Sequence, residues 1–478
     1  MLTELYPTLK SSSTPQEHWE YVKTSMAKFI KQYCRQRGSW RQKQLKALQS
    51  KRNRFLHDQQ SRVIRAQVLP TIESQISVLQ KEITDILAIW SGTRWREHSE
   101  VSAGYLQRTI QQRQTSRYIA QLQHPSTGEI HPDPEGMQRA ASVFYQSLYT
   151  MDEVDDDSID LLLNSLSQNT SLNNDEAESL YCDFEINELR VAAKRSPKQS
   201  SPGDDGLSYS FFYLLFQHLL YENLITKIYN QACQDGIFPK SWQHTCLILL
   251  PKKGDLSLLR NWRPLSLINC DAKLFTRLIN KRIINVAQSL ITPFQTGFLP
   301  NRFIAKNGLL VRLMMEQAKH QQHHDTIGLM LDFEKAYDRL HPVYLSTVLK
   351  KFGFPTCIIN SICNLFFSTQ IRININGHLS SSITQHRGLR QGDPLSPILF
   401  NLALEPLLQS ILRDQHFQGI LPMLPPTIAP HLSPRPIHLK VLGYADDVFV
   451  FLHPQSDLER LDLHLSTYQK ASNAKLNP

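Results

Sequence analysis

Two adjacent carboxylates, Asp446 and Asp447, stand between short apolar runs near the C-terminal end of the chain. The runs at 441–442 and 448–452 predict a β-hairpin with both acids at its tight turn. Neighbouring carboxylates repel one another, so the pair requires a cation that neutralises it. A bare Asp-Asp pair is more often an acidic turn in solvent, but these flanks are apolar enough to bury the arms of the hairpin.

A third carboxylate comes from an upstream stretch, where the apolar run 328–331 leads to Asp332. We expect a strand that ends at Asp332, just before the chain enters a helix. One carboxylate from a strand end and two from a hairpin would form an oxygen-only site suited to Mg²⁺. Two such ions about 4 Å apart would activate a 3′-hydroxyl and stabilise a leaving pyrophosphate.

These two stretches resemble motifs A and C of the reverse transcriptase palm, and residues 444–447 (Tyr-Ala-Asp-Asp) match motif C residue for residue. More narrowly, the chain resembles the polymerase region of a non-LTR (LINE-type) retrotransposon protein. The resemblance implies an α+β fold: right-hand fingers and palm, with an antiparallel palm sheet flanked by helices. A mostly helical, basic N-terminal region precedes it.

The same resemblance implies a role for each residue of the two motifs. Asp332 and Asp446 would bridge two Mg²⁺ ions, with Asp447 completing the cluster and the backbone carbonyl of Phe333 as a further ligand. Tyr337 lies where reverse transcriptases place an aromatic ring that excludes a ribose 2′-hydroxyl by clash. Asp338, the next residue, is interpreted as a structural carboxylate rather than a ligand.

Two further stretches imply nucleotide contacts. Residues 261–268 resemble the Arg-Pro-Ile-Ser fingers motif, in which Arg263 would present its rigid guanidinium fork to an incoming triphosphate. Residues 387–401 closely resemble motif B of the non-LTR and group II intron lineages. There Gly392 permits close backbone approach, and Gln391 offers amide groups beside the nascent base pair. Lys252 and Lys273 are weaker triphosphate candidates, since a single lysine is more often a surface charge.

Template and primer contacts are expected from residues 295–302, which resemble the Gln-x-Gly-Phe-x-x-x-Arg segment of the family. Asn301 and Arg302 are assigned to the template backbone, and Tyr444 of motif C to the template and primer. The C-terminal residues 473–478 resemble the opening of motif D and stop short of the lysine that the family places a few residues later.

The net charge of +9 is concentrated in one region. Residues 21–120 carry 19 Lys and Arg against 6 Asp and Glu, so the remainder of the chain is slightly acidic. Cationic helices bind polyanions by releasing phosphate counterions, so this basic arm is interpreted as a clamp for template RNA. A solvated charged face is the alternative. Apolar residues at 72, 76, 79, 83, 86 and 90 predict either a short coiled coil or a helix packed on its own domain.

Composition and punctuation divide the chain into four regions. Residues 1–18 are polar and expected to be disordered. Residues 19–150 form the basic helical region, and 151–180 an acidic, Asn/Ser-rich linker. Residues 181–478 hold fingers and palm without a thumb, and include a Pro-rich surface loop at 421–436.

The seven cysteines are scattered without a Cys-x-x-Cys pair, so neither a zinc site nor a disulfide framework is indicated. No apolar run reaches the length of a membrane span, and the N-terminus lacks the layout of a signal peptide. We therefore expect an intracellular protein of nucleus and cytoplasm with no membrane partner.

Together with the resemblance, these features predict a Mg²⁺-dependent RNA-directed DNA polymerase that uses an RNA template, a DNA primer and dNTPs. The resemblance implies that the primer is a nicked strand of target DNA. The alternative is a retrotransposon remnant that binds RNA and no longer polymerises, because thumb and motif D are missing. An RNA-templated RNA polymerase is disfavoured by residues 444–447 and by Tyr337.

Overall fold

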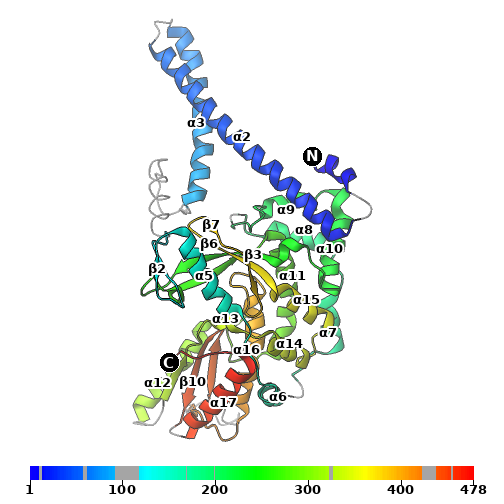
Figure 1. Ribbon diagram of the computed structural model, residues 1–478, viewed down its shortest axis with the longest axis vertical. Helices are drawn as coiled ribbons and strands as arrows, with labels where there is room; N and C mark the ends of the chain where they lie inside the picture. The colour runs from blue at the N-terminus through cyan, green and yellow to red at the C-terminus, as the bar shows by residue number, and fades with distance from the viewer. Residues whose placement is uncertain are drawn as a thin grey trace, which may run out of the picture.

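The computed structural model describes residues 1–9, 13–57, 62–91, 118–167, 170–198, 200–321, 327–422, 438–453 and 456–477. Helices and two larger sheets form the body of the molecule, from which two long helices project (Figure 1). The expected mixture of helices with an antiparallel sheet is confirmed. The helix expected across 92–117 and most of the Pro-rich loop at 421–436 lie outside the described residues.

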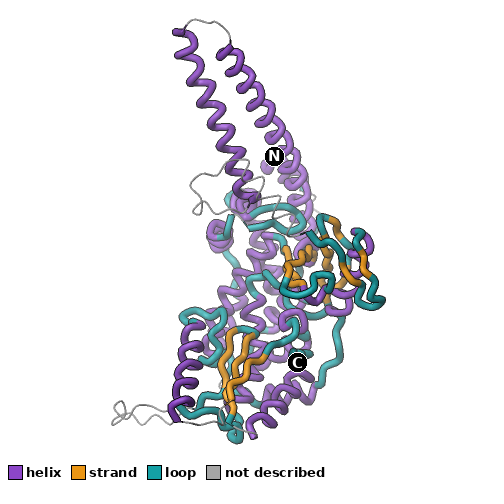
Figure 2. Tube along the Cα trace, turned by 90° about the vertical axis from the view of Figure 1, so that its left-hand side faces the viewer, coloured by secondary structure: helices purple, strands orange, loops and turns teal. Residues whose placement is uncertain are grey.

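The first larger sheet has three antiparallel strands in the order β5–β10–β9 (Figure 2). Its strands are β5 (Ile327–Leu331), β9 (Val441–Tyr444) and β10 (Asp447–Leu452). Leu331, Val448 and Val450 are buried on one face, because side chains alternate along a strand. They share one apolar core with the buried residues of helices α16 (Ser396–Arg413) and α17 (Ser456–Ser472).

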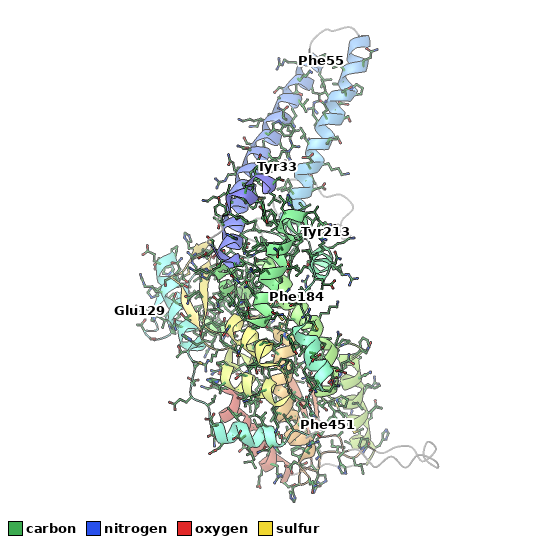
Figure 3. The ribbon with its side chains drawn as sticks, turned by 90° about the vertical axis from the view of Figure 1, so that its right-hand side faces the viewer. Tyr33, Phe55, Glu129, Phe184, Tyr213 and Phe451 are labelled. Carbon is green, nitrogen blue, oxygen red and sulfur yellow. The ribbon has the colours of Figure 1, made fainter. Side chains whose placement is uncertain are left out.

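The opposite face of this sheet is packed by aromatic rings. A Cβ atom on Gly328 would lie 2.5 Å from Cζ of Phe449, so a larger residue there would have to displace that ring. Helix α12 (Ile304–Gln321) supplies Met314 to a small cluster with Leu442 and Phe451, the latter labelled in Figure 3. The sheet is therefore supported on both faces, which fixes the position of its strand ends.

The second larger sheet has the strand order β4–β3–β6–β7, and β8 also pairs with β6. Its strands are β3 (His244–Pro251), β4 (Trp262–Leu267), β6 (Thr369–Ile375), β7 (His378–Leu379) and β8 (Ile383–Gln385). Strands β3 and β6 run parallel, and β3 pairs with β4 in antiparallel fashion. Helix α5 (Pro134–Tyr149) packs on this sheet, since Met137 and Tyr145 share a core with Leu247 and Ile373.

Helices fill the space between and beside the two sheets, and their apolar faces form most of the main core. Their bounds are α7 (Asn174–Tyr181), α8 (Ile186–Arg195), α9 (Tyr209–Phe216), α10 (Glu222–Gln234), α11 (Cys270–Leu290), α13 (Ala336–Arg339), α14 (Pro342–Lys351) and α15 (Thr356–Phe366). Short 3₁₀ turns and the β1–β2 hairpin complete the body: Tyr6–Thr8, Leu219–Tyr221, Lys240–Gln243, Leu259–Asn261, Leu122–Gln123 and Ile130–His131.

The projecting helices are α2 (Pro15–His57) and α3 (Arg62–Ser91), which run antiparallel beside one another (Figures 1 and 2). Ile72, Ile76 and Leu79 are buried, as the apolar spacing predicted, and Arg41 of α2 forms an ion pair with Glu82 of α3. The seam of α3 therefore packs on α2 of the same chain.

Two regions differ from the sequence expectations. Within residues 1–18, expected to be disordered, helix α1 (Leu2–Leu5) and the start of α2 are formed. The expected linker at 151–180 contains α6 (Asp156–Asn164) and α7. Ile159 and Leu162 of α6 are buried in the main core, because the acidic residues occupy the helix start while the apolar ones share one face.

None of the helices among the described residues is both long enough and apolar enough to cross a lipid bilayer.

Candidate active site

The hairpin between β9 and β10 places two of the three carboxylates. Ala445 and Asp446 form its turn, and Asp447 is the first residue of β10, paired with Tyr444. Ala445 has a φ of 54°, the left-handed conformation that two-residue hairpin turns require. The hairpin expected from sequence is present, although only Asp446 lies in the turn itself.

The third carboxylate, Asp332, directly follows β5. The register pairs Leu331 with Val448, so the next step along both strands brings Asp332 level with Asp447. Side chains of opposed residues in an antiparallel pair project to the same face. All three carboxylates line one cavity of about 830 Å³.

Most of the other residues expected from sequence line the same cavity. They come from β4, the segment after β5, the loop before α16 and the end of β9. Those residues are Arg263, Phe333, Tyr337, Gln391, Gly392 and Tyr444, together with Lys252. Asn301, Arg302 and Lys273 do not line it.

The cavity disfavours the ionised form of Asp446. Burial raises the pKa of Asp446 above its ordinary value, and the charges of Asp447 and Asp332 raise it further. Arg263 partly opposes this effect. Among the described residues, no three acidic, histidine or cysteine side chains stand close enough together to hold one ion. The three carboxylates therefore share a cavity without forming a closed cluster.

The donor set nevertheless fits Mg²⁺, because hard oxygen ligands and excess negative charge are what this ion takes. Phe333 pairs with Leu476 in an antiparallel bridge, flanked by hydrogen bonds that use the carbonyl of Asp332 and the N–H of Glu334. Alternate residues of a paired strand direct their backbone groups to opposite edges. The carbonyl of Phe333 thus points away from Leu476, toward the side on which β10 lies.

The loop before α16 is attached to the edge of the second sheet. The N–H of Ser266 in β4 donates to the carbonyl of Gln391 at 2.9 Å. Gly392 has a φ of 102°, and a Cβ there would lie 3.1 Å from a methyl of Leu265. Arg263 is exposed on the same strand. Strand β4 therefore presents a guanidinium and a glycine loop to one side of the cavity.

The ring of Tyr337 stacks on Phe400 of α16, with ring centroids 4.7 Å apart and planes 17° from parallel. Burial, with the charge of Asp446, raises the pKa of the Tyr337 hydroxyl. The ring is therefore held rigidly at the wall of the cavity.

Asp338 is buried behind that wall and accepts two hydrogen bonds. Tyr149 Oη donates to its Oδ1 at 3.2 Å, and Gln391 Nε2 donates to its Oδ2 at 2.9 Å. Burial raises the pKa of Asp338 to about 6. Tyr149, at the end of α5, was not singled out by sequence; its only signal was an aromatic in a predicted helix. Through Asp338 it fixes the orientation of the Gln391 amide.

Gln295 holds the hairpin turn from behind. Its buried side chain accepts from the N–H of Ala445 at 2.9 Å and donates to the carbonyl of Ala445 at 3.2 Å. It also accepts from the N–H of Gly297 at 2.9 Å. Sequence placed this segment on the template side, whereas Gln295 itself fixes the residue that precedes Asp446.

The structure gives Arg302 a different role from the expected template contact. Its guanidinium donates to the carbonyls of Gln295 at 2.8 Å and Ile291 at 3.0 Å, and also to those of Thr292 and Gln288. Arg302 thus satisfies the carbonyls at the C-terminal end of α11. Asn301 is exposed in a left-handed turn, outside the cavity.

Comparison with known proteins agrees with this geometry. Residues 250–478 match the family described as reverse transcriptase (RNA-dependent DNA polymerase). The chain is 32% identical over 345 residues to the transposon TX1 uncharacterized 149 kDa protein of Xenopus laevis, covering 72% of this chain and 25% of that protein.

Two Drosophila melanogaster relatives match a smaller share of the chain. The Pol polyprotein of the type-2 retrotransposable element R2DM is 28% identical, over 47% of this chain and 21% of its own length. The RNA-directed DNA polymerase from mobile element jockey is 25% identical, over 45% and 24% respectively. The chain thus spans a quarter or less of these relatives.

The matched part of the chain is therefore similar to RNA-dependent DNA polymerases, which are nucleotidyltransferases. Residues 250–478 belong to the reverse transcriptase family, and their relatives are non-LTR retrotransposon proteins, as the motifs indicated.

Proposed function

We propose that this chain is an active RNA-directed DNA polymerase that extends a DNA 3′ end along an RNA template. The supporting observation is the convergence of Asp332, Asp446 and Asp447 on one open cavity. An acidic turn in solvent would not bring a distant strand end alongside it. The nicked strand of target DNA would serve as primer, and the protein would act in the nucleus as well as the cytoplasm.

The two larger sheets correspond to two parts of a polymerase hand. The three-stranded sheet, which carries all three carboxylates, is the palm. The five-stranded sheet, which presents Arg263 beside the Gln391–Gly392 loop, belongs to the fingers. Helix α5 and the β1–β2 hairpin pack on that sheet, so residues 118–149 are part of the same unit.

Asp332, Asp446, Asp447 and the carbonyl of Phe333 would hold two Mg²⁺ ions. When bound, the ions supply an activated 3′-hydroxyl and charge neutralisation on the leaving pyrophosphate. The fold positions these three carboxylates. Strand register aligns Asp332 with Asp447, and Gln295 holds the turn that carries Asp446.

The incoming nucleotide would lie between the two sheets. The exposed guanidinium of Arg263 would take its triphosphate, because a planar fork matches phosphate oxygens. Gln391, oriented by Asp338, and Gly392 would lie beside the new base pair. The stacked ring of Tyr337 would block a ribose 2′-hydroxyl, so dNTPs would be preferred.

Template RNA would contact Tyr444 at the hairpin side of the cavity, Asn301 outside the cavity, and the exposed basic face of α2 further out. Tyr444 lies near Phe298, with ring centroids 6.1 Å apart, which provides an aromatic surface for a base or sugar. Figure 3 labels Tyr33 and Phe55 along α2, well away from the sheets.

The test is primer extension with purified chain, an RNA template, an annealed DNA primer and dNTPs. We expect incorporation that Asp446→Asn reduces by about a thousandfold, equivalent to about 4 kcal/mol of activation free energy. Glu459→Gln, on the exposed face of α17, is the matched control and should retain wild-type rate. RNA binding without any incorporation by the wild-type chain would support the remnant instead.

A further inference from the structure

The segment 473–477 runs alongside the residues that follow β5, although the two lie far apart in sequence. The N–H of Glu334 donates to the carbonyl of Lys475 at 2.7 Å, and the N–H of Asn477 donates to the carbonyl of Asp332 at 2.9 Å. Leu476 lies between them, opposite Phe333. These contacts extend the three-stranded sheet by a short stretch at the edge that bears Asp332.

The side chain of Asn477 makes a further contact. Its Nδ2 donates to Oδ2 of Asp332 at 2.7 Å, and both side chains face the cavity that holds Asp446 and Asp447. A carboxylate oxygen has two lone pairs, and a carboxylate has two oxygens, so one donated bond leaves most of the group free for a cation. The contact restricts rotation of the Asp332 carboxylate without occupying it.

Residue type matters at this position. An amide donates a hydrogen bond while remaining uncharged, so it orients the carboxylate without competing with a divalent cation. A lysine there would neutralise Asp332, and an aspartate would repel it. The amide is itself positioned by its own backbone bond to Asp332, which fixes the reach of its short side chain.

We propose that Asn477 is a positioning residue that holds the Asp332 carboxylate in its ligating orientation and thereby raises the affinity of the site for divalent cations. This inference rests on the proposed function. Asn477 acts through Asp332 and touches no substrate, in the way that outer-shell partners orient metal-ligating carboxylates.

The first test measures metal binding rather than activity. The full chain, without nucleic acid or dNTP, is titrated with MnCl₂, and free Mn²⁺ is followed by electron paramagnetic resonance. We expect Asn477→Ala to weaken Mn²⁺ binding about 10- to 100-fold. Asn477→Ser, whose hydroxyl is too short to reach Asp332, should weaken Mn²⁺ binding to the same extent. It replaces Asn477→Ala as the test variant if the alanine variant does not fold.

Leu476→Ala is the matched control. Leu476 packs against the main core from the same short segment, so its truncation should lower the thermal unfolding temperature while leaving Mn²⁺ affinity unchanged. Asn477→Ala should show the reverse pattern, because its backbone hydrogen bond to Asp332 remains.

A kinetic measurement separates the same possibilities. In primer extension, Asn477→Ala should raise the Mg²⁺ concentration for half-maximal rate, with the rate largely restored at saturating Mg²⁺. A folded Asn477→Ala chain that binds Mn²⁺ within about twofold of wild type would overturn the inference alone. A wild-type chain that binds no Mn²⁺ would overturn the proposed function and the inference with it.

Discussion

At the scale of single residues, the hairpin turn depends on one buried amide. Gln295 satisfies both backbone groups of Ala445, a residue held at positive φ, and the N–H of Gly297. Without that side chain, three buried backbone groups would have no partner, and the strained turn that carries Asp446 would lose its support.

We therefore expect Gln295→Leu to lower the free energy of unfolding by about 3 kcal/mol and to reduce polymerase activity at temperatures where the chain stays folded. Denaturant unfolding and primer extension measure the two effects. Gln288→Leu, the same substitution on the exposed face of α11, is the control. Equal stability of the two variants would show that the Gln295 contacts carry no net energy.

The residues that sequence could identify are those whose chemistry dictates their type. Asp332, Asp446 and Asp447 were expected from their residue type and flanking pattern, and in the structure all three line one cavity. Supporting residues carry no such signature, because Gln295 and Tyr149 act through ordinary hydrogen bonds to groups far away in sequence. Arg302 was assigned to template for the opposite reason, since its charge suggested a phosphate while its partners are carbonyls.

At the scale of elements, Arg302 stabilises the C-terminal end of helix α11 and the loop that follows it. The last carbonyls of a helix lack intrahelical partners, and a guanidinium that donates to four of the carbonyls in this region supplies them. Burial lowers the pKa of Arg302 from its ordinary value, as expected for a side chain engaged inside the fold.

Arg302→Met should therefore lower the unfolding free energy by about 2 kcal/mol while leaving RNA affinity nearly unchanged. Lys306→Met, at an exposed position in the first turn of α12, is the charge-matched control and should be neutral for stability. Thermal unfolding and RNA binding by fluorescence anisotropy test this assignment. Loss of RNA affinity with unchanged stability would restore the template role.

Helix α16 carries a second element-scale feature, the buried carboxyl of Glu405. It accepts from the N–H of Thr292 at 2.8 Å and from Gln409 at 2.6 Å, which ties α16 to the loop after α11. Burial raises the pKa of Glu405 from 4.5 to about 8, because its charged form is poorly solvated there.

Between pH 4.5 and 8 the folded chain holds more protons at Glu405 than the unfolded chain, so its stability falls as the pH rises through this window. Glu405→Gln keeps both acceptor contacts and cannot ionise. We expect its free energy of unfolding to equal that of wild type near pH 4.5 and to be higher by roughly a few kcal/mol above pH 8. Unfolding temperatures measured across this range test the sign, and parallel curves would contradict it.

Elements with a strong local pattern were predictable, and those defined by distant packing were not. The β9–β10 hairpin and the strand before Asp332 follow from alternation and turn residues. The acidic run at 152–157 looked like a linker because its charges suggest solvent. In the structure Asp155 caps α6 by accepting from the N–H of Ser158, and Asp152 pairs with Arg387 at 2.7 Å. Ser158 is a local partner, three residues after Asp155, but Arg387 lies 235 residues from Asp152 and could not be inferred from the acidic run.

At the scale of the whole molecule, the N-terminal arm is rooted in the main apolar core. Trp19 is fully buried and donates to Asp271 of α11 at 2.8 Å, as does Trp242 at 2.7 Å. Lys23 forms ion pairs with Asp271 at 2.8 Å and Asp205 at 2.9 Å. Composition suggested a separate basic region from 19 to 150. In the structure both ends of this region pack into the body, through Trp19 and Lys23 at one end and helix α5 at the other. The sequence did not indicate this packing, because the partners of Trp19 and Lys23 lie far along the chain.

Beyond this root, α2 leaves the body (Figure 1). The exposed lysines Lys28, Lys31, Lys43 and Lys46 are spread along its length. A helix held rigidly at one end and charged along the rest can follow an RNA backbone and displace its counterions. The geometry favours backbone contact rather than base recognition, since lysine ammonium groups act as point charges.

Replacing these four lysines with glutamine should weaken RNA binding at low salt. The slope of log affinity against log salt concentration should become shallower by about 3, because each lost phosphate contact removes roughly 0.7 to 0.9. Replacing the same four with arginine keeps every charge and should keep the slope. Primer extension from a preannealed template at saturating RNA should survive in both variants, because the three-stranded sheet and the root at Lys23 are untouched. An unchanged slope in the glutamine variant would show that α2 is a solvated face and that template RNA is held by the body alone.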